Sequence, residues 1–162
     1  MNNGHTDFET ELKNSGRLIY TNVGVSMLPL IREGRDVLII EAREPSALRK
    51  YDIVLFRRDH TRGRGRYILH RLLRTREDGS FFIAGDNCDE GENVLPPQIL
   101  GVLTGLRRGE REIRLSGLRY RLYVALWCAP YPLRFRALRF GRFMKYAAGA
   151  AVRKLKNIRG KS

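Results

Sequence analysis

Several features are scarce or absent in this chain, and each absence excludes a class of protein. Its 162 residues include two cysteines, Cys88 and Cys128, which lie far apart and have no metal-ligand spacing. We therefore expect no disulfide framework, no metal and no cofactor, and a reduced environment for both thiols. The polar N-terminal stretch has no apolar segment, which predicts neither a signal peptide nor a membrane anchor there.

Long apolar runs are also missing. The longest one near the end of the chain covers residues 122–133, which is 12 residues, and it contains Pro130 and Pro132. A membrane-spanning helix needs roughly 20 consecutive apolar residues. This stretch is therefore too short to cross a bilayer simply.

Acidic residues are absent from the end of the chain. All 17 lie at or before Glu112, whereas residues 116–162 contain 12 of the 31 lysines and arginines. The first 115 residues are nearly neutral, with 19 cations against 17 acids. This asymmetry predicts a polyanionic partner for the basic tail, either an anionic membrane surface or, less favoured, a nucleic acid.

Short apolar segments separated by turn residues predict a mostly β body between about Arg17 and Leu115. The expected strands begin near residues 17, 36, 51, 66, 80 and 99, and hairpin turns are expected at 77–79 and 108–110. A short helical segment is expected over 27–32. The predicted organisation is a polar lead at 1–16, a β domain at 17–115 and a basic tail at 116–162.

The tail interleaves apolar and basic residues. From Leu133 onward, apolar residues at 133, 135, 138, 140 and 143 alternate with arginines at 134, 136, 139 and 142. The pattern is consistent with an imperfect amphipathic helix. Such a helix could pack on the β body with a solvated arginine face, or it could lie at a membrane interface.

Ser26 and His70 are the first two candidates for chemistry. A serine that opens a short helical turn can be a nucleophile with free N–H groups nearby, or it can simply cap the turn. A histidine on an apolar strand can be a core residue, or a neutral base at physiological pH. His5 and His60 lie in polar segments and are weaker candidates.

The acidic turn at 85–92 is the third candidate. A carboxylate in this turn could contact the imidazole ring and fix its tautomer, although such a sequence is also ordinary turn chemistry. Asp86 is the preferred residue, and Asp89 and Glu92 are alternatives.

Four segments occur in a recognisable order between about Val23 and Leu106. They read GxSMxPxxxxGRDVLII, KYDIVLF, ILHRLL and a strand ending in GDN. Together they resemble the signal peptidase I family, whose superfamily also includes self-cleaving repressors. The resemblance implies a signal-peptidase-like catalytic β domain, with Ser26 as nucleophile and His70 as base, as in the Ser-His, endoplasmic-reticulum and archaeal-like branch.

The same resemblance extends to further positions. It matches Asp86 to the first aspartate of the GDN box, and it places Met27 and Pro29 beside the nucleophile as substrate-binding residues. Gly24 stands where a serine often assists the oxyanion hole, so backbone N–H groups are expected to suffice.

Two functions follow as hypotheses. The preferred one is a serine endopeptidase that cleaves an extended peptide or precursor protein after small residues through a Ser-His dyad or triad. The alternative is a catalytically inactive β module that binds a membrane surface or nucleic acid through residues 116–162. We expect the protein to be membrane-associated, peripherally or as a monotopic protein, and otherwise cytoplasmic.

Overall fold

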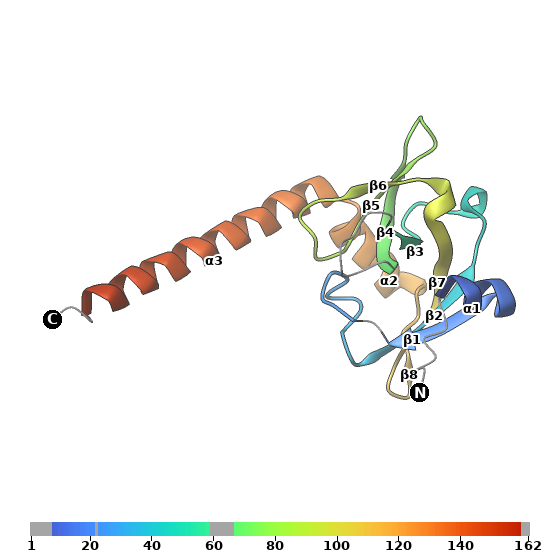
Figure 1. Cartoon of the computed structure of the whole chain (residues 1–162), viewed down its shortest axis with the longest axis horizontal. Coiled ribbons are helices and arrows are strands. Elements are labelled where there is room, and N and C mark those ends of the chain that lie inside the picture. The colour runs from blue at the N-terminus through green and yellow to red at the C-terminus, as the bar shows by residue number, and fades with distance from the viewer. Residues whose placement is uncertain (1–7, 22, 59–66, 160–162) are drawn as a thin grey trace.

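A computed structural model describes residues 8–21, 23–58 and 67–159, with side chains through residue 149. Figure 1 shows a β body from which one long C-terminal helix extends. The strands are β1 Arg17–Thr21, β2 Asp36–Ala42, β3 Ile53–Arg57, β4 Tyr67–Thr75, β5 Phe81–Ala84, β6 Glu92–Val94, β7 Ile99–Arg108 and β8 Arg111–Glu112. Every pairing among them is antiparallel, which confirms a mainly β fold.

The strand order in the sheet is β1-β2-β7-β3-β4-β5-β6, with β8 paired to β7. The expected hairpin at 77–79 joins β4 to β5, and Gly79 supplies the left-handed backbone of its turn with φ of 77°. Gly109 does the same between β7 and β8. Short 3-10 turns, η1 Pro45–Ala47 and η2 Pro96–Gln98, complete the body.

Two apolar clusters form the core. The first contains Leu38 and Ile40 of β2 with Leu103 and Leu106 of β7. The second is built mainly on strands β3, β4, β5 and β7. Strand β4 is buried on both faces at its centre, from Leu69 to Leu73, so polar residues in that stretch need partners inside the protein.

The N-terminal lead contributes to the body. Helix α1, Phe8–Ser15, buries Leu12 in the first cluster, and its Phe8 ring stacks on Tyr67 at 5.0 Å between centroids. Glu9 forms an ion pair with Arg57 at 3.1 Å. Residues 8–15 are therefore packed on the sheet.

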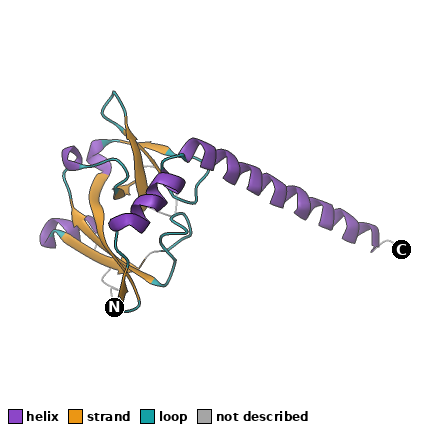
Figure 2. Cartoon of the chain, turned by 180° about the vertical axis from the view of Figure 1, so that it is seen from behind, coloured by secondary structure: helices purple, strands orange, loops and turns teal. Residues whose placement is uncertain are grey.

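The tail is helical, as its pattern predicts. Helix α2, Gly117–Tyr123, runs into the π-helical segment η3, Val124–Cys128, and then into α3, Tyr131–Arg159. Figure 2 shows α2 against the strands and α3 extending beyond them. None of the helices in the described part of the chain is long and apolar enough to span a membrane.

Candidate active site

Ser26 lies in the loop between β1 and β2. Residues 26–30 form consecutive turns, so the predicted helix at 27–32 is wrong. Two local backbone bonds order the segment, from Leu28 N–H to Val25 O at 3.2 Å and from Ile31 N–H to Met27 O at 3.0 Å. Pro29 has no N–H to donate and disfavours helical backbone in the residue before it, which explains why no helix forms.

The loop is anchored to the body on both sides of Pro29. Met27 and Ile31 are fully buried in the first core cluster. Met27 was expected to contact substrate, but its side chain is buried in the core. Pro29, the other expected substrate-binding residue, is exposed. Further along, the Asp36 carboxylate accepts the Arg32 N–H at 2.8 Å.

Arg108 of β7 connects this anchor to the loop. Its guanidinium donates two hydrogen bonds of 2.7 Å to the Asp36 carboxylate. The same group donates to the Leu30 carbonyl at 2.9 Å. The backbone that follows Ser26 is therefore held to strands β2 and β7.

His70 lies on β4 opposite Val54 and is 8% exposed. Burial lowers the pKa of His70 to about 4, since the nearby Glu92 carboxylate offsets the desolvation only in part. The ring is consequently neutral at physiological pH and can accept a proton. His5 and His60, the weaker candidates, lie outside the described residues.

The two ring nitrogens of His70 have different surroundings. Nδ1 is buried and has no hydrogen-bond partner among the described residues, but Oε1 of Glu92 lies 3.8 Å away. Nε2 faces Gly85 at the end of β5. Glu92 itself forms an ion pair with Arg58.

Gly85 is the point at which the predicted site residues meet. A Cβ placed on Gly85 lies 2.5 Å from the Ser26 carbonyl oxygen and 3.1 Å from His70 Nε2. The same position is 2.7 Å from the Cys88 sulfur. Residues far apart in the sequence thus converge on a spot where only glycine fits.

Further bonds tie the acidic turn to the Ser26 loop. The Asn87 N–H donates to the Ser26 carbonyl at 2.8 Å, and the Asn87 side chain donates to the Val25 carbonyl at 3.1 Å. The Ser26 hydroxyl makes no hydrogen bond to His70 or to any other described residue. The structure therefore brings the Ser26 carbonyl and the His70 ring next to Gly85 but does not pair the hydroxyl with the ring.

Asp86 does not contact the His70 ring. Its two carboxylate oxygens accept hydrogen bonds from Arg71, one from Nε at 2.8 Å and one from Nη2 at 2.6 Å. Consecutive strand residues point to opposite faces, so the partner of Arg71 cannot also reach His70. Of the three carboxylates proposed to orient the ring, Glu92 is the one within ion-pair distance of it.

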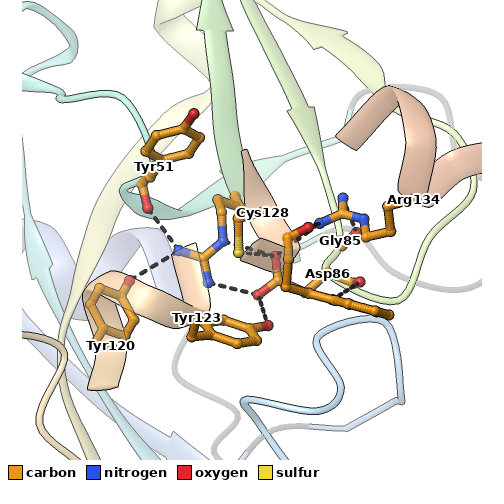
Figure 3. Close-up of polar contacts among 9 residues, drawn as sticks. Tyr51, Gly85, Asp86, Tyr120, Tyr123, Cys128 and Arg134 are labelled. Carbon is orange, nitrogen blue, oxygen red and sulfur yellow. Dashed lines mark hydrogen bonds and ion pairs between the residues drawn. The ribbon is translucent and has the colours of Figure 1, made fainter. Parts of the chain in front are cut away.

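The tail encloses the Arg71–Asp86 pair, and Figure 3 shows this network. The Tyr123 hydroxyl donates to the Asp86 carboxylate at 2.8 Å, and Trp127 Nε1 donates to the Asp86 carbonyl at 2.9 Å. Arg134 donates to the Gly85 carbonyl at 3.3 Å. The first helices of the tail thereby fix the turn on which Ser26 and His70 converge.

Burial and the Asp86 carboxylate shift the pKa values of this network. Burial raises the pKa of Tyr123 and, with Asp86 beside it, raises the pKa of the Cys128 thiol to about 12. Burial acts to lower the pKa of Arg71, but the bonded Asp86 carboxylate outweighs it and the pKa is raised. Tyr123 and Cys128 therefore stay neutral, and Arg71 stays charged.

A pocket of about 370 Å³ opens beside the ring. Its lining residues are Arg58, His70, Ile83, Cys88, Asp89, Glu90, Gly91, Glu92 and Arg142. Arg142 comes from α3 and forms an ion pair with Asp89 at 2.8 Å. Burial raises the pKa of the Cys88 thiol, which opposes formation of a thiolate there.

Sequence reasoning missed Arg71 and its partners. An arginine between Leu69 and Leu73, on an apolar face of a central strand, was the available signal, because a buried cation requires a buried anion. Within the described ranges, no group of three or more His, Cys, Asp or Glu side chains is arranged to hold a metal ion.

Comparisons with known proteins add no further identification. A scan with protein-family models and searches of curated proteins and solved structures found no match to this chain.

Proposed function

We propose that this protein is a serine endopeptidase similar to signal peptidase I, with Ser26 as nucleophile and His70 as general base. The supporting observation is the convergence at Gly85, where the Ser26 backbone and His70 Nε2 approach one position. The lowered pKa of His70, about 4, keeps the ring uncharged at physiological pH, but it also makes the ring a weaker base than an unperturbed histidine.

In this proposal, Ser26 Oγ attacks the scissile carbonyl while His70 Nε2 takes the hydroxyl proton. The C–N bond then breaks, His70 returns the proton to the leaving amine, and water releases the acyl group from Ser26. Backbone N–H groups, including that of Ser26, stabilise the oxyanion. Oγ must come within hydrogen-bond distance of Nε2, as catalytic hydrogen bonds often do only when substrate binds.

Glu92 is the proposed orienting carboxylate, since its Oε1 lies 3.8 Å from His70 Nδ1. Asp86 holds the turn through Arg71 and the tail, and is a positioning residue. The Ser-His centre is therefore a triad only if Glu92 moves slightly closer to the ring.

The proposed substrate is an extended segment with small residues one and three positions before the cut, as the family resemblance implies. Strand β1 leads directly into the Ser26 loop, and among the described strands its only neighbour is β2. A peptide could add to the other edge of β1 by main-chain hydrogen bonds.

Cleavage of Ala-x-Ala peptides by purified variants tests this proposal. Ser26→Ala and His70→Gln should each lower kcat/KM by roughly 1,000-fold or more. Ser46→Ala is the matched control, since Ser46 is exposed in η1, and should leave kcat/KM unchanged.

Cys88→Ala completes the set, because its thiol approaches the same position at Gly85. Activity that survives in Ser26→Ala but is lost in Cys88→Ala refutes the serine assignment. A wild-type protein that cleaves no peptide, with the fold intact, would leave the catalytically inactive β module as the function.

A further inference from the structure

Helix α3 presents an apolar stripe that the β body does not cover. The stripe consists of Leu133, Ala137, Phe140, Met144 and Ala148, which recur every three or four residues and so share one helical face. Leu133 and Phe140 are each 65% exposed, and Met144 is 50% exposed. A series of exposed large apolar side chains on one helix indicates an interaction surface.

The contacts of α3 with the body lie on a different side of the helix. Arg134 is 4% exposed, and Arg139 and Arg142 donate to the Asp89 and Asn87 carbonyls at 3.2 and 3.3 Å. At about 100° per residue, Arg139 and Arg142 point away from the stripe on the opposite side of the helix, and Arg134 points about a quarter turn from it. The contacts therefore fix the start of α3 with its apolar stripe turned outward, and Figures 1 and 2 show the rest of the helix clear of the body.

We propose that this stripe lies on the surface of an anionic membrane, with α3 parallel to the bilayer plane. Exposed Arg136 and Lys145 lie on the two flanks of the stripe, and the tail from residue 116 carries 12 cations and no acid. An amphipathic helix with a basic polar face binds such surfaces by apolar insertion and attraction to anionic headgroups.

Two other partners for the stripe, a second copy of the chain and a nucleic acid, fit its charge and apolar character less well. A second copy of the chain would bring two stripes together between rows of like charge, with no acidic residue on either helix to pair with them. A nucleic acid would pair with the cations but would leave the apolar stripe in water. The inference does not depend on the peptidase proposal, since no substrate is involved.

Vesicle co-sedimentation of the full-length protein tests the inference. Vesicles of phosphatidylcholine with one-third phosphatidylglycerol are compared with pure phosphatidylcholine, at low and high salt. We expect binding to the anionic vesicles, with a fraction that persists at high salt because of apolar insertion. The double variant Phe140→Gln/Met144→Gln should weaken this binding at least tenfold.

Tyr146→Gln is the matched control, because Tyr146 is 72% exposed on the side of α3 away from the stripe. It should change vesicle binding less than twofold, and both proteins should keep the wild-type thermal unfolding, since the substituted side chains are exposed. The inference is overturned by no binding to anionic vesicles, by equal loss in both variants, or by tighter binding to an oligonucleotide. Dimerisation that the double variant abolishes would assign the stripe to a second copy and also overturn it.

Discussion

At the scale of single residues, the burial of His70 determines its proton affinity. The side chain sits on a strand whose centre is covered on both faces, so its charged form loses water, and the nearby Glu92 carboxylate offsets this loss only in part. Glu92 at 3.8 Å is too far to bond Nδ1 in this state. The ring is therefore neutral, but its lowered pKa makes it a weak base until an anion such as Glu92 lies closer to Nδ1.

This burial predicts how folding stability depends on pH. The folded-state pKa of His70 is about 4, whereas the pKa of an unperturbed histidine is 6.5. The unfolded chain therefore binds more protons between these values, so the His70 contribution is fully present above pH 6.5 and is lost as pH falls towards 4. The loss should reach about 3 kcal/mol.

Urea unfolding of wild type and His70→Gln at pH 7 and pH 4 measures this contribution. Other groups titrate in both proteins, so the relevant quantity is the difference between their changes in unfolding free energy. Wild type should lose more stability than His70→Gln on acidification. Equal losses would show that the ring is not buried in its neutral form.

The family resemblance, more than the residue types alone, proposes Ser26 and His70 as the site, and it leaves the partner of His70 open among three carboxylates. The choice between Asp86 and Glu92 depends on which face of β4 each carboxylate approaches, and that follows from long-range pairing. Asp86 is taken by Arg71 on the opposite face. The alternation along β4 placed Arg71 and His70 on different faces, but it did not show which turn would meet which face.

At the scale of elements, the turn after β5 joins the Ser26 loop to the rest of the body. Gly85→Ala tests this junction, because its Cβ would lie 2.5 Å from the Ser26 carbonyl oxygen. We expect a stability loss of about 1–3 kcal/mol from overpacking. Peptide cleavage should fall further than this loss explains, since the Ser26 loop or the His70 ring must shift.

Gly101→Ala is the matched control for Gly85→Ala. Its Cβ would lie equally close, 2.5 Å, to the Glu41 carbonyl oxygen, in the pairing of β7 with β2. It should destabilise the protein to a similar extent, and activity per folded molecule should be retained. Equal activity per folded molecule in both variants would contradict the proposed role of the turn.

Local patterns explain which elements could be predicted. The strands and the hairpins at 77–79 and 108–110 follow from apolar runs and from glycines with left-handed backbone. The segment at 27–32 has helix-compatible spacing, yet Pro29 and the burial of Met27 and Ile31 produce turns instead. The packing of α2 on the body could not be predicted from the sequence. Tyr120 and Tyr123 bind Arg71 and Asp86, and that buried pair forms only when β4 and the turn after β5 come together.

At the scale of the whole molecule, the tail has two parts with different roles. Residues from Gly117 to Arg142 enclose Arg71 and Asp86 and support the acidic turn. Beyond Arg142, α3 continues to Arg159 away from the sheet (Figure 1). The basic tail is thus attached to a nearly neutral body through an interface of hydrogen bonds and ion pairs, which include Arg71–Asp86 and Arg142–Asp89.

Two truncations should separate these parts. Ending the chain after Phe143 removes most of the projecting helix but keeps Arg134, Arg142 and the enclosed ion pair, so the unfolding free energy should change by less than about 0.5 kcal/mol. Ending it after Leu115 removes Tyr123 and Trp127 and exposes the Asp86 turn. This shorter chain should lose about 3–5 kcal/mol or fail to fold, as when a buried charge loses its partners.

Urea unfolding, followed by circular dichroism, and vesicle binding are measured on both proteins. The chain that ends at Phe143 should keep the fold and lose most membrane binding, because Met144 and the following apolar residues are gone. If it unfolds like the chain that ends at Leu115, the projecting helix stabilises the body and the division is wrong. If both truncated chains are as stable as wild type, Tyr120, Tyr123 and Trp127 do not stabilise the turn at Asp86. The proposed connection between the tail and the candidate site would then be wrong.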